Sequence, residues 1–147
     1  MDVTNCETFL ILKFERSAKK ITAKFPNKYN RDNEYEELYN NFEHLFCDVF
    51  WGFDVGPGWF KFIADFVVKL DVHVKRNNYD PKEYKIMTVK NKFGMLRIYL
   101  AKSDFYLNSL LAEIEANASD ACIVCGEPIT GAIGIYSQMC EKHIKEF

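Results

Sequence analysis

The side chains best suited to do chemistry lie near the C-terminus, in the segment CIVCGEPITGAIGIYSQMCEKHIKEF. Cys122 and Cys125 form one closely spaced pair, and Cys140 and His143 form a second pair with the same spacing. Zn²⁺ takes four thiolate or imidazole ligands in a tetrahedron, and a Cys-x-x-Cys turn lets two thiolates reach one ion. Gly126 allows the sharp turn that must follow the first pair. The sequence therefore predicts a zinc site formed by these four side chains.

The predicted zinc is structural, because four protein ligands saturate a tetrahedral ion. A catalytic zinc keeps one position for water and has a carboxylate nearby as a general base. The His-x-Glu…Pro-Cys-x-x-Cys pattern of zinc deaminases is absent from the sequence. Glu127 and Glu141 are the acids closest to the ligands, and a lone exposed carboxylate is usually only solvated.

Two alternatives for the cysteines stay open. They could be ordinary buried thiols, with His143 on the surface, although Cys6 and Cys47 are the only cysteines outside the cluster. The first pair could also be a redox Cys-x-x-Cys motif, although it lacks the preceding strand and the long following helix of thioredoxin-like proteins.

The composition indicates one ordinary domain. The chain has 147 residues, a net charge of −2 and 16% aromatic residues, which is ample material for a core. It has no apolar run long enough for a transmembrane helix, and its first residues lack the pattern of a signal peptide. We therefore expect a cytoplasmic protein without a membrane partner, in a compartment where clustered thiols bind metal more often than they form disulfides.

Hydrophobic periodicity predicts helices in the first half of the chain. One helix is expected over residues 8–25, where Pro26 would end it. A second is expected over residues 35–50, with Asn33 as its cap and Glu36 completing a capping box.

The second half of the chain combines helices with a hairpin. Pro57 suits the first position of a helix that points Trp59 inward. Two strands are expected around residues 91–94, because apolar and polar residues alternate after that turn. Ser103 is the expected cap of the following helix.

These elements predict an α+β fold, in which helices pack on a short β-hairpin and the chain ends in a zinc finger. The layout of the finger, with a knuckle, a hairpin and ligands at the start of a last helix, resembles a treble clef. We divide the chain into a helical α+β domain over residues 1–118, with its hairpin near residues 84–100, and a zinc-finger-like module over residues 119–147.

Patterns of catalytic sites are missing from the rest of the sequence. It contains no P-loop, no GxGxxG and no nucleophile elbow. His44 and His73 have no Ser, Cys or Asp at a recognisable spacing, so both are expected to be plain surface histidines. The sequence therefore predicts a protein that is not an enzyme.

The predicted hairpin is a candidate binding surface. Between residues 84 and 102 the sequence has five basic residues and no acid, and Tyr84, Phe93 and Tyr99 lie among them. Basic residues with interleaved aromatics suit phosphates and stacked bases, whereas the alternative is a solvated sheet face that protects its edge. The candidate contact residues are Lys85, Lys90, Lys92, Phe93, Arg97 and Lys102. The acidic segment 31–50 is a second candidate, for a basic partner, although a charged helix face is usually only solvated.

Five segments carry a family resemblance. FPNKYN, WGFDVGPGWFKFI, VKNKFGMLRIYL, CIVCG and CEKH occur in this order. Together they resemble a family of small phage and prophage proteins of unknown function, which share a Gly-Trp helix start, a V-K-x-K-F-G-x-L-R hairpin and a zinc-finger-like end. The resemblance covers residues 25–147. This sequence departs from the family pattern near Val55 and Pro57, where the resemblance implies a cysteine and an acidic residue.

The resemblance implies a phage setting, and the charged surfaces of the hairpin and of segment 31–50 indicate binding to a macromolecule. We therefore expect a non-enzymatic phage or prophage accessory protein with a structural Zn²⁺, acting in the bacterial host cytoplasm. Its partner would be a host protein or ribonucleoprotein complex, for example a CRISPR-type defence complex that it inhibits. The alternative is a nucleic-acid-binding zinc module that uses the basic hairpin, and a second alternative is a metal-dependent enzyme.

Overall fold

The computed structural model describes residues 27–129 and 138–146 and has the predicted α+β class. The helix expected over residues 8–25, its end at Pro26, and the stretch between the two ligand pairs at 130–137 lie outside these ranges.

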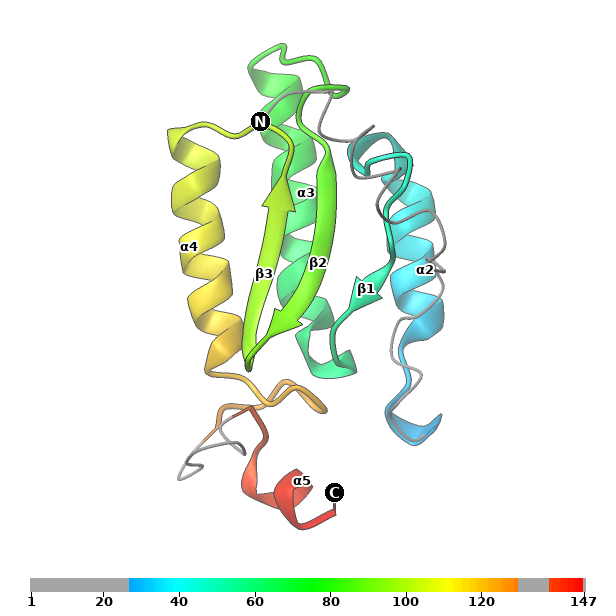
Figure 1. Cartoon of the computed structure of the whole chain (residues 1–147), viewed down its shortest axis with the longest axis vertical. Coiled ribbons are helices and arrows are strands. Elements are labelled where there is room, and N and C mark those ends of the chain that lie inside the picture. Colours follow the sequence, from blue (N-terminus) through cyan, green and yellow to red (C-terminus); the bar gives the residue numbers. More distant parts are fainter. Residues whose placement is uncertain (1–26, 130–137, 147) are drawn as a thin grey trace.

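The predicted hairpin is confirmed, and it belongs to a three-stranded sheet (Figure 1). Strand β2 (Ile86–Lys92) pairs antiparallel with β3 (Met95–Leu100). The third strand, β1 (Phe53–Asp54), pairs parallel with the other side of β2. Sequence analysis missed β1, because two residues carry no measurable alternation.

One helix lies behind this sheet and one lies at each of its sides (Figure 1). The helix α3 (Phe60–Arg76) connects β1 to β2 and lies behind the sheet, whereas α4 (Phe105–Ser119) lies beside β3 and α2 (Asp32–Asn41) beside β1. In the part of the chain that is described, no helix is both long enough and apolar enough to span a bilayer.

The core lies between the sheet and α3. Trp59 is completely buried, as predicted, at the end of a short 3-10 helix that opens with Pro57 and continues into α3. The alternating residues of β3 that face the core, Leu96 and Ile98 among them, are buried as the period of the strand required.

The helix predicted over residues 35–50 is wrong in its second half, because α2 ends at Asn41. Phe46 instead forms a parallel bridge with Ile86, and the Cys47 amide donates to the Ile86 carbonyl at 2.9 Å. The rings of Phe46 and Phe50 pack at 4.6 Å between centroids. Pairing with β2 and burial of these rings outweigh the local helical preference, which is a weak force by comparison.

Both predicted caps are displaced. Arg31, not Asn33, is the residue that precedes α2, and the Asn30 side chain accepts from the Asp32 amide at 2.6 Å. Asp104, not Ser103, caps α4, because its Oδ1 accepts from the Leu107 amide at 2.8 Å. An aspartate at this position is a strong cap in its own right, so the sequence did contain this signal.

Candidate functional site

The four predicted metal ligands come together in space. Their ligand atoms all lie within 4.8 Å of one another. The Cys125 and Cys140 sulfurs are 3.8 Å apart, and His143 Nδ1 lies 3.5 Å from the Cys122 sulfur. Two sulfurs about 2.3 Å from one tetrahedral ion would be about 3.8 Å apart. The cluster therefore has the size of a tetrahedral metal site, and these four residues could hold a metal ion.

The pKa shifts of Cys122 and His143 suit metal ligands, whereas burial raises the pKa of the Cys125 thiol to about 11 and favours its protonated form in the metal-free protein. Burial lowers the pKa of His143, which favours the neutral imidazole that coordinates a metal. Burial on its own would raise the pKa of the Cys122 thiol, but hydrogen bonds from the backbone amides of Cys140, Cys125 and Val124 lower it overall. Backbone amides that point at a sulfur favour its thiolate form, which is the form that binds metal.

Two elements bring the ligands together. Cys122 and Cys125 lie on a tight turn, closed by a 2.8 Å hydrogen bond from the Gly126 amide to the Cys122 carbonyl. Gly126 has a φ of 80°, where a side chain would be strained. Cys140 directly precedes the helix α5 (Glu141–Glu146), which carries His143. The predicted position of the second pair, at the start of a last helix, is confirmed.

The turn that carries Cys122 and Cys125 contacts the core through the Gly-Pro-Gly segment at residues 56–58, which precedes α3. The Gly58 amide donates to the Ile123 carbonyl at 2.7 Å, and the Trp59 indole donates to the Ala121 carbonyl at 3.1 Å. A Cβ at Gly58 would lie 2.2 Å from the Cys122 carbonyl oxygen. The glycine is therefore needed for close backbone approach, a reason that only the tertiary structure reveals.

The last helix is tied to the same end of the molecule. The Tyr29 hydroxyl donates to the Glu146 carboxylate at 2.6 Å, and Lys28 forms an ion pair with the same carboxylate at 2.7 Å. The Tyr29 ring also packs edge-on against His143, with 4.9 Å between centroids. The second ligand pair thus contacts residues at the start of the described chain.

Three sulfurs and one imidazole could together fill the coordination sphere of one tetrahedral ion. Cys125 is the one exposed ligand, whereas Cys122 and His143 are almost completely buried.

The basic hairpin differs from what the sequence predicted, because acids outside residues 84–102 neutralise it in part. Lys102 pairs with Glu83 at 2.8 Å, and Arg97 lies 3.7 Å from Glu115 of α4. Asp54 of β1 is the register partner of Lys90, so the two lie on one face of the sheet.

Two further hairpin residues are engaged inside the protein. The Lys85 ammonium donates to the His44 carbonyl at 2.9 Å. Tyr84, one of the aromatics expected to stack on bases, is buried, and its ring lies parallel to that of Tyr79 at 4.5 Å. The expectation for Tyr84 is therefore wrong, because its ring is already covered by another ring.

The turn of the hairpin is exposed to solvent. Phe93 is 94% exposed, and both Phe93 (φ 55°) and Gly94 (φ 86°) have left-handed backbone conformations. This is the pattern of a type I′ turn, in which Asn, Asp or Gly is preferred at both central positions. Within the described ranges, no acid lies at ion-pair distance from Lys92. We call Lys90, Lys92, Phe93, Met95 and Tyr99 the hairpin tip.

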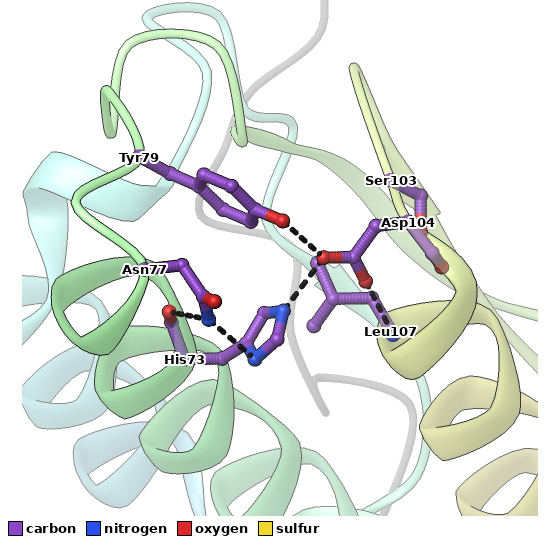
Figure 2. A network of polar contacts seen from close by, with 6 residues as sticks. All are labelled: His73, Asn77, Tyr79, Ser103, Asp104 and Leu107. Carbon is purple, nitrogen blue, oxygen red and sulfur yellow. Dashed lines mark hydrogen bonds and ion pairs between the residues drawn. The ribbon is translucent and has the colours of Figure 1, made fainter.

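His73 is not the plain surface histidine that the sequence predicted. Figure 2 shows its imidazole pointing at Asp104, with the Tyr79 hydroxyl reaching the same carboxylate oxygen and the Leu107 amide at the other oxygen. His73 Nε2 lies 2.7 Å from the Asp104 carboxylate, and the Tyr79 hydroxyl donates to it at 2.9 Å. The other ring nitrogen lies 3.1 Å from the Asn77 amide. Because both ring nitrogens are engaged, the network joins the end of α3 to the start of α4 and offers no open base.

His44 is exposed, as predicted, and it too has an aspartate partner. Its Nε2 lies 2.8 Å from Asp71, which also pairs with Lys75 at 2.8 Å. Burial opposes ionisation of Asp71, but these two partners lower its pKa overall. Asp71 and Asp104 are far from their histidines in sequence, so no local spacing could have identified either pair.

The His73 network makes a prediction about stability. Asp104→Asn should lower the free energy of unfolding at pH 7 by about 1–2 kcal/mol, because hydrogen bonds to an ionised acceptor are stronger than neutral ones. Asparagine is itself a good cap, so the loss reports on the carboxylate rather than on capping. Asp65→Asn, which removes an exposed ion pair with Lys69, should cost less than about 0.5 kcal/mol.

The same variant has an expected pH dependence. Burial opposes ionisation of Asp104, but hydrogen bonds from His73, the Leu107 amide and Tyr79 lower its pKa overall. The ionised Asp104 carboxylate therefore makes its full contribution to the free energy of unfolding above the ordinary carboxyl pKa of about 4. This contribution is lost as the pH falls through the lower pKa of the folded protein. Urea unfolding should show the difference between the original protein and Asp104→Asn shrinking below about pH 4. A difference that is constant from neutral to strongly acidic pH would contradict this account.

Comparison of the chain with protein-family models, with curated proteins and with solved structures gives no match.

Proposed function

We propose that this protein is a non-enzymatic binding protein in which a structural Zn²⁺ at Cys122, Cys125, Cys140 and His143 stabilises the fold and the hairpin tip contacts a macromolecular partner. Three thiolates and an imidazole form a typical set for zinc, which binds such soft and borderline ligands tightly. The complete ligand set and the engaged nitrogens of His73 support a protein without a catalytic centre.

The observation that carries the proposal is the conformation of Phe93. A bulky residue in the left-handed region costs about 1–2 kcal/mol, and this one leaves almost its whole ring in water. Backbone strain of this kind is concentrated at functional sites. An aromatic side chain held out at the end of a rigid hairpin is suited to fill an apolar pocket of a partner, with Lys92 beside it.

The partner that fits the hairpin tip best is a protein. A nucleic-acid surface needs several unpaired cations, whereas Arg97 and Lys102 face carboxylates and Lys85 is bound to a carbonyl. The resemblance to phage and prophage proteins favours a host protein, and a subunit of a CRISPR-type defence complex is one form that this partner can take. Nucleic acid is the alternative partner of the same hairpin.

Phe93→Ala is the test of this proposal. After a partner is identified by capture from bacterial lysate, this variant should bind it about 30-fold more weakly, the effect expected for a hot-spot aromatic. Phe105→Ala is a matched control, because Phe105 is 88% exposed at the start of α4 and should not change the affinity. Equal affinities for the original protein and Phe93→Ala would refute the hairpin tip as the contact surface.

Phe93→Asn separates binding from stability. Asparagine tolerates the left-handed region, so this variant should be more stable than the original protein by about 1 kcal/mol while also losing affinity. Thermal unfolding and a binding titration measure the two effects. Affinity that falls steeply with salt, and that disappears after nuclease treatment, would instead assign the hairpin to nucleic acid.

A further inference from the structure

A hydrogen-bond chain connects the metal centre to the hairpin tip. The Asn91 side chain donates through Nδ2 to Gln138 Oε1 at 2.7 Å. Gln138 lies two residues before Cys140 and is therefore part of the segment that carries the second ligand pair. Figure 1 shows the same proximity, with the turn between β2 and β3 lying directly against the metal-binding end of the chain.

Asn91 holds the turn that exposes Phe93. Its Oδ1 accepts from the Gly94 amide at 2.8 Å, across Lys92 and the left-handed Phe93. One end of the Asn91 amide is thus bound to Gln138 and the other end to the turn. Since the turn is strained at Phe93, an external contact that fixes Asn91 also selects this conformation of the turn.

The position of Gln138 depends in turn on the two metal-binding segments. Its backbone carbonyl accepts from the Ile123 amide at 2.7 Å, between the cysteines of the first pair. The segments that supply the first and second ligand pairs therefore meet at Gln138. An ion bound by both pairs would hold these segments together, in addition to the backbone hydrogen bond from Ile123 to Gln138 that joins their described residues.

We infer that metal binding at Cys122, Cys125, Cys140 and His143 sets the conformation of the hairpin turn through Gln138 and Asn91. The metal-loaded protein presents Phe93 in one orientation, and loss of the metal releases it. Gln138 and Asn91 are positioning residues, because they act on Phe93 without contacting the partner. This inference rests on the proposed function for its role in recognition, but the coupling itself can be measured without any partner.

The test is hydrogen exchange of the Gly94 amide, followed by NMR in the full-length zinc-loaded protein. Gln138→Ala should speed exchange of this amide at least tenfold while the protein still holds one zinc per chain. Gln138→Glu keeps an acceptor for Asn91 and should restore slow exchange. The Ala101 amide, which donates to the Lys85 carbonyl at 2.8 Å at the opposite end of the hairpin, is the internal control and should not change.

The outcomes separate the inference from the proposed function. Unchanged Gly94 exchange in Gln138→Ala would overturn the coupling, even if Phe93→Ala abolishes binding. Faster exchange with full affinity for the captured partner would overturn the role of the coupling in recognition. Faster exchange together with an affinity that does not depend on Phe93 would retain the coupling and refute the hairpin tip as the contact surface. Chelation of the zinc should also speed exchange of the Gly94 amide, but because it destabilises the core as well, the specific test is Gln138→Ala with the Ala101 amide as control.

Discussion

Removal of the metal should unfold the C-terminal end of the protein and destabilise the core with it. A zinc site of this ligand type contributes on the order of 10 kcal/mol to folding, which is comparable to the whole stability of a small domain. Ile123 and Val124, between the first two ligands, belong to the same buried cluster as Trp59. The destabilisation caused by loss of the ion should therefore extend from the ligand turn into the core.

Metal analysis and circular dichroism measure this effect. We expect one zinc per chain in the purified protein and a large fall in the melting temperature after chelation, reversed when zinc is restored. Cys122→Ser should be more damaging than Cys125→Ser, because Cys122 is buried and Cys125 is the exposed ligand. A zinc content near zero, with Cys122, Cys125 and Cys140 all freely titratable in the native protein, would refute the metal centre.

Trp59→Ala should cost about 3–5 kcal/mol of unfolding free energy, which is the usual effect of truncating a buried aromatic. Trp59 has no exposed surface, and its indole donates to the Ala121 carbonyl, one residue before the first metal ligand. The variant should therefore lose stability and also hold zinc less tightly. Urea unfolding and a competition with a zinc chelator give the two quantities.

Trp59→Phe is the control that separates packing from the hydrogen bond. Phenylalanine keeps most of the buried apolar area but leaves the Ala121 carbonyl without its indole donor, so we expect a smaller cost of about 1–2 kcal/mol. A Trp59→Ala protein with normal stability that fails to bind its partner would contradict the burial of this residue and mark it as part of an interface.

Features that depend on neighbours in sequence were predictable. The spacing of the two ligand pairs identified all four residues that meet in the cluster, because a tight turn and one helical turn both place side chains three positions apart side by side. The hairpin was equally predictable, because β3 alternates with the period of a strand and follows a turn that contains glycine. Trp59 was expected to lie inside and does.

Features that depend on distant contacts were not predictable. The sequence placed the end of α2 too late, because it cannot reveal that Phe46 forms a β-bridge with Ile86 and that the Cys47 amide donates to the Ile86 carbonyl. The sequence also presented the hairpin as strongly basic, because the acids that face it belong to β1, to α4 and to the segment before β2. A count along the chain cannot include charges that only folding brings near.

Periodicity and spacing, which are properties of neighbouring residues, were enough to predict the α+β class, the hairpin, the inward position of Trp59 and the grouping of three cysteines with His143. The folded structure adds the contacts between these parts. It places the ligand turn on Gly58, brings Asp104 to His73, and links Gln138 to the turn that exposes Phe93. Each of these contacts joins residues far apart in the chain, and their short local segments carry no pattern that pairs them.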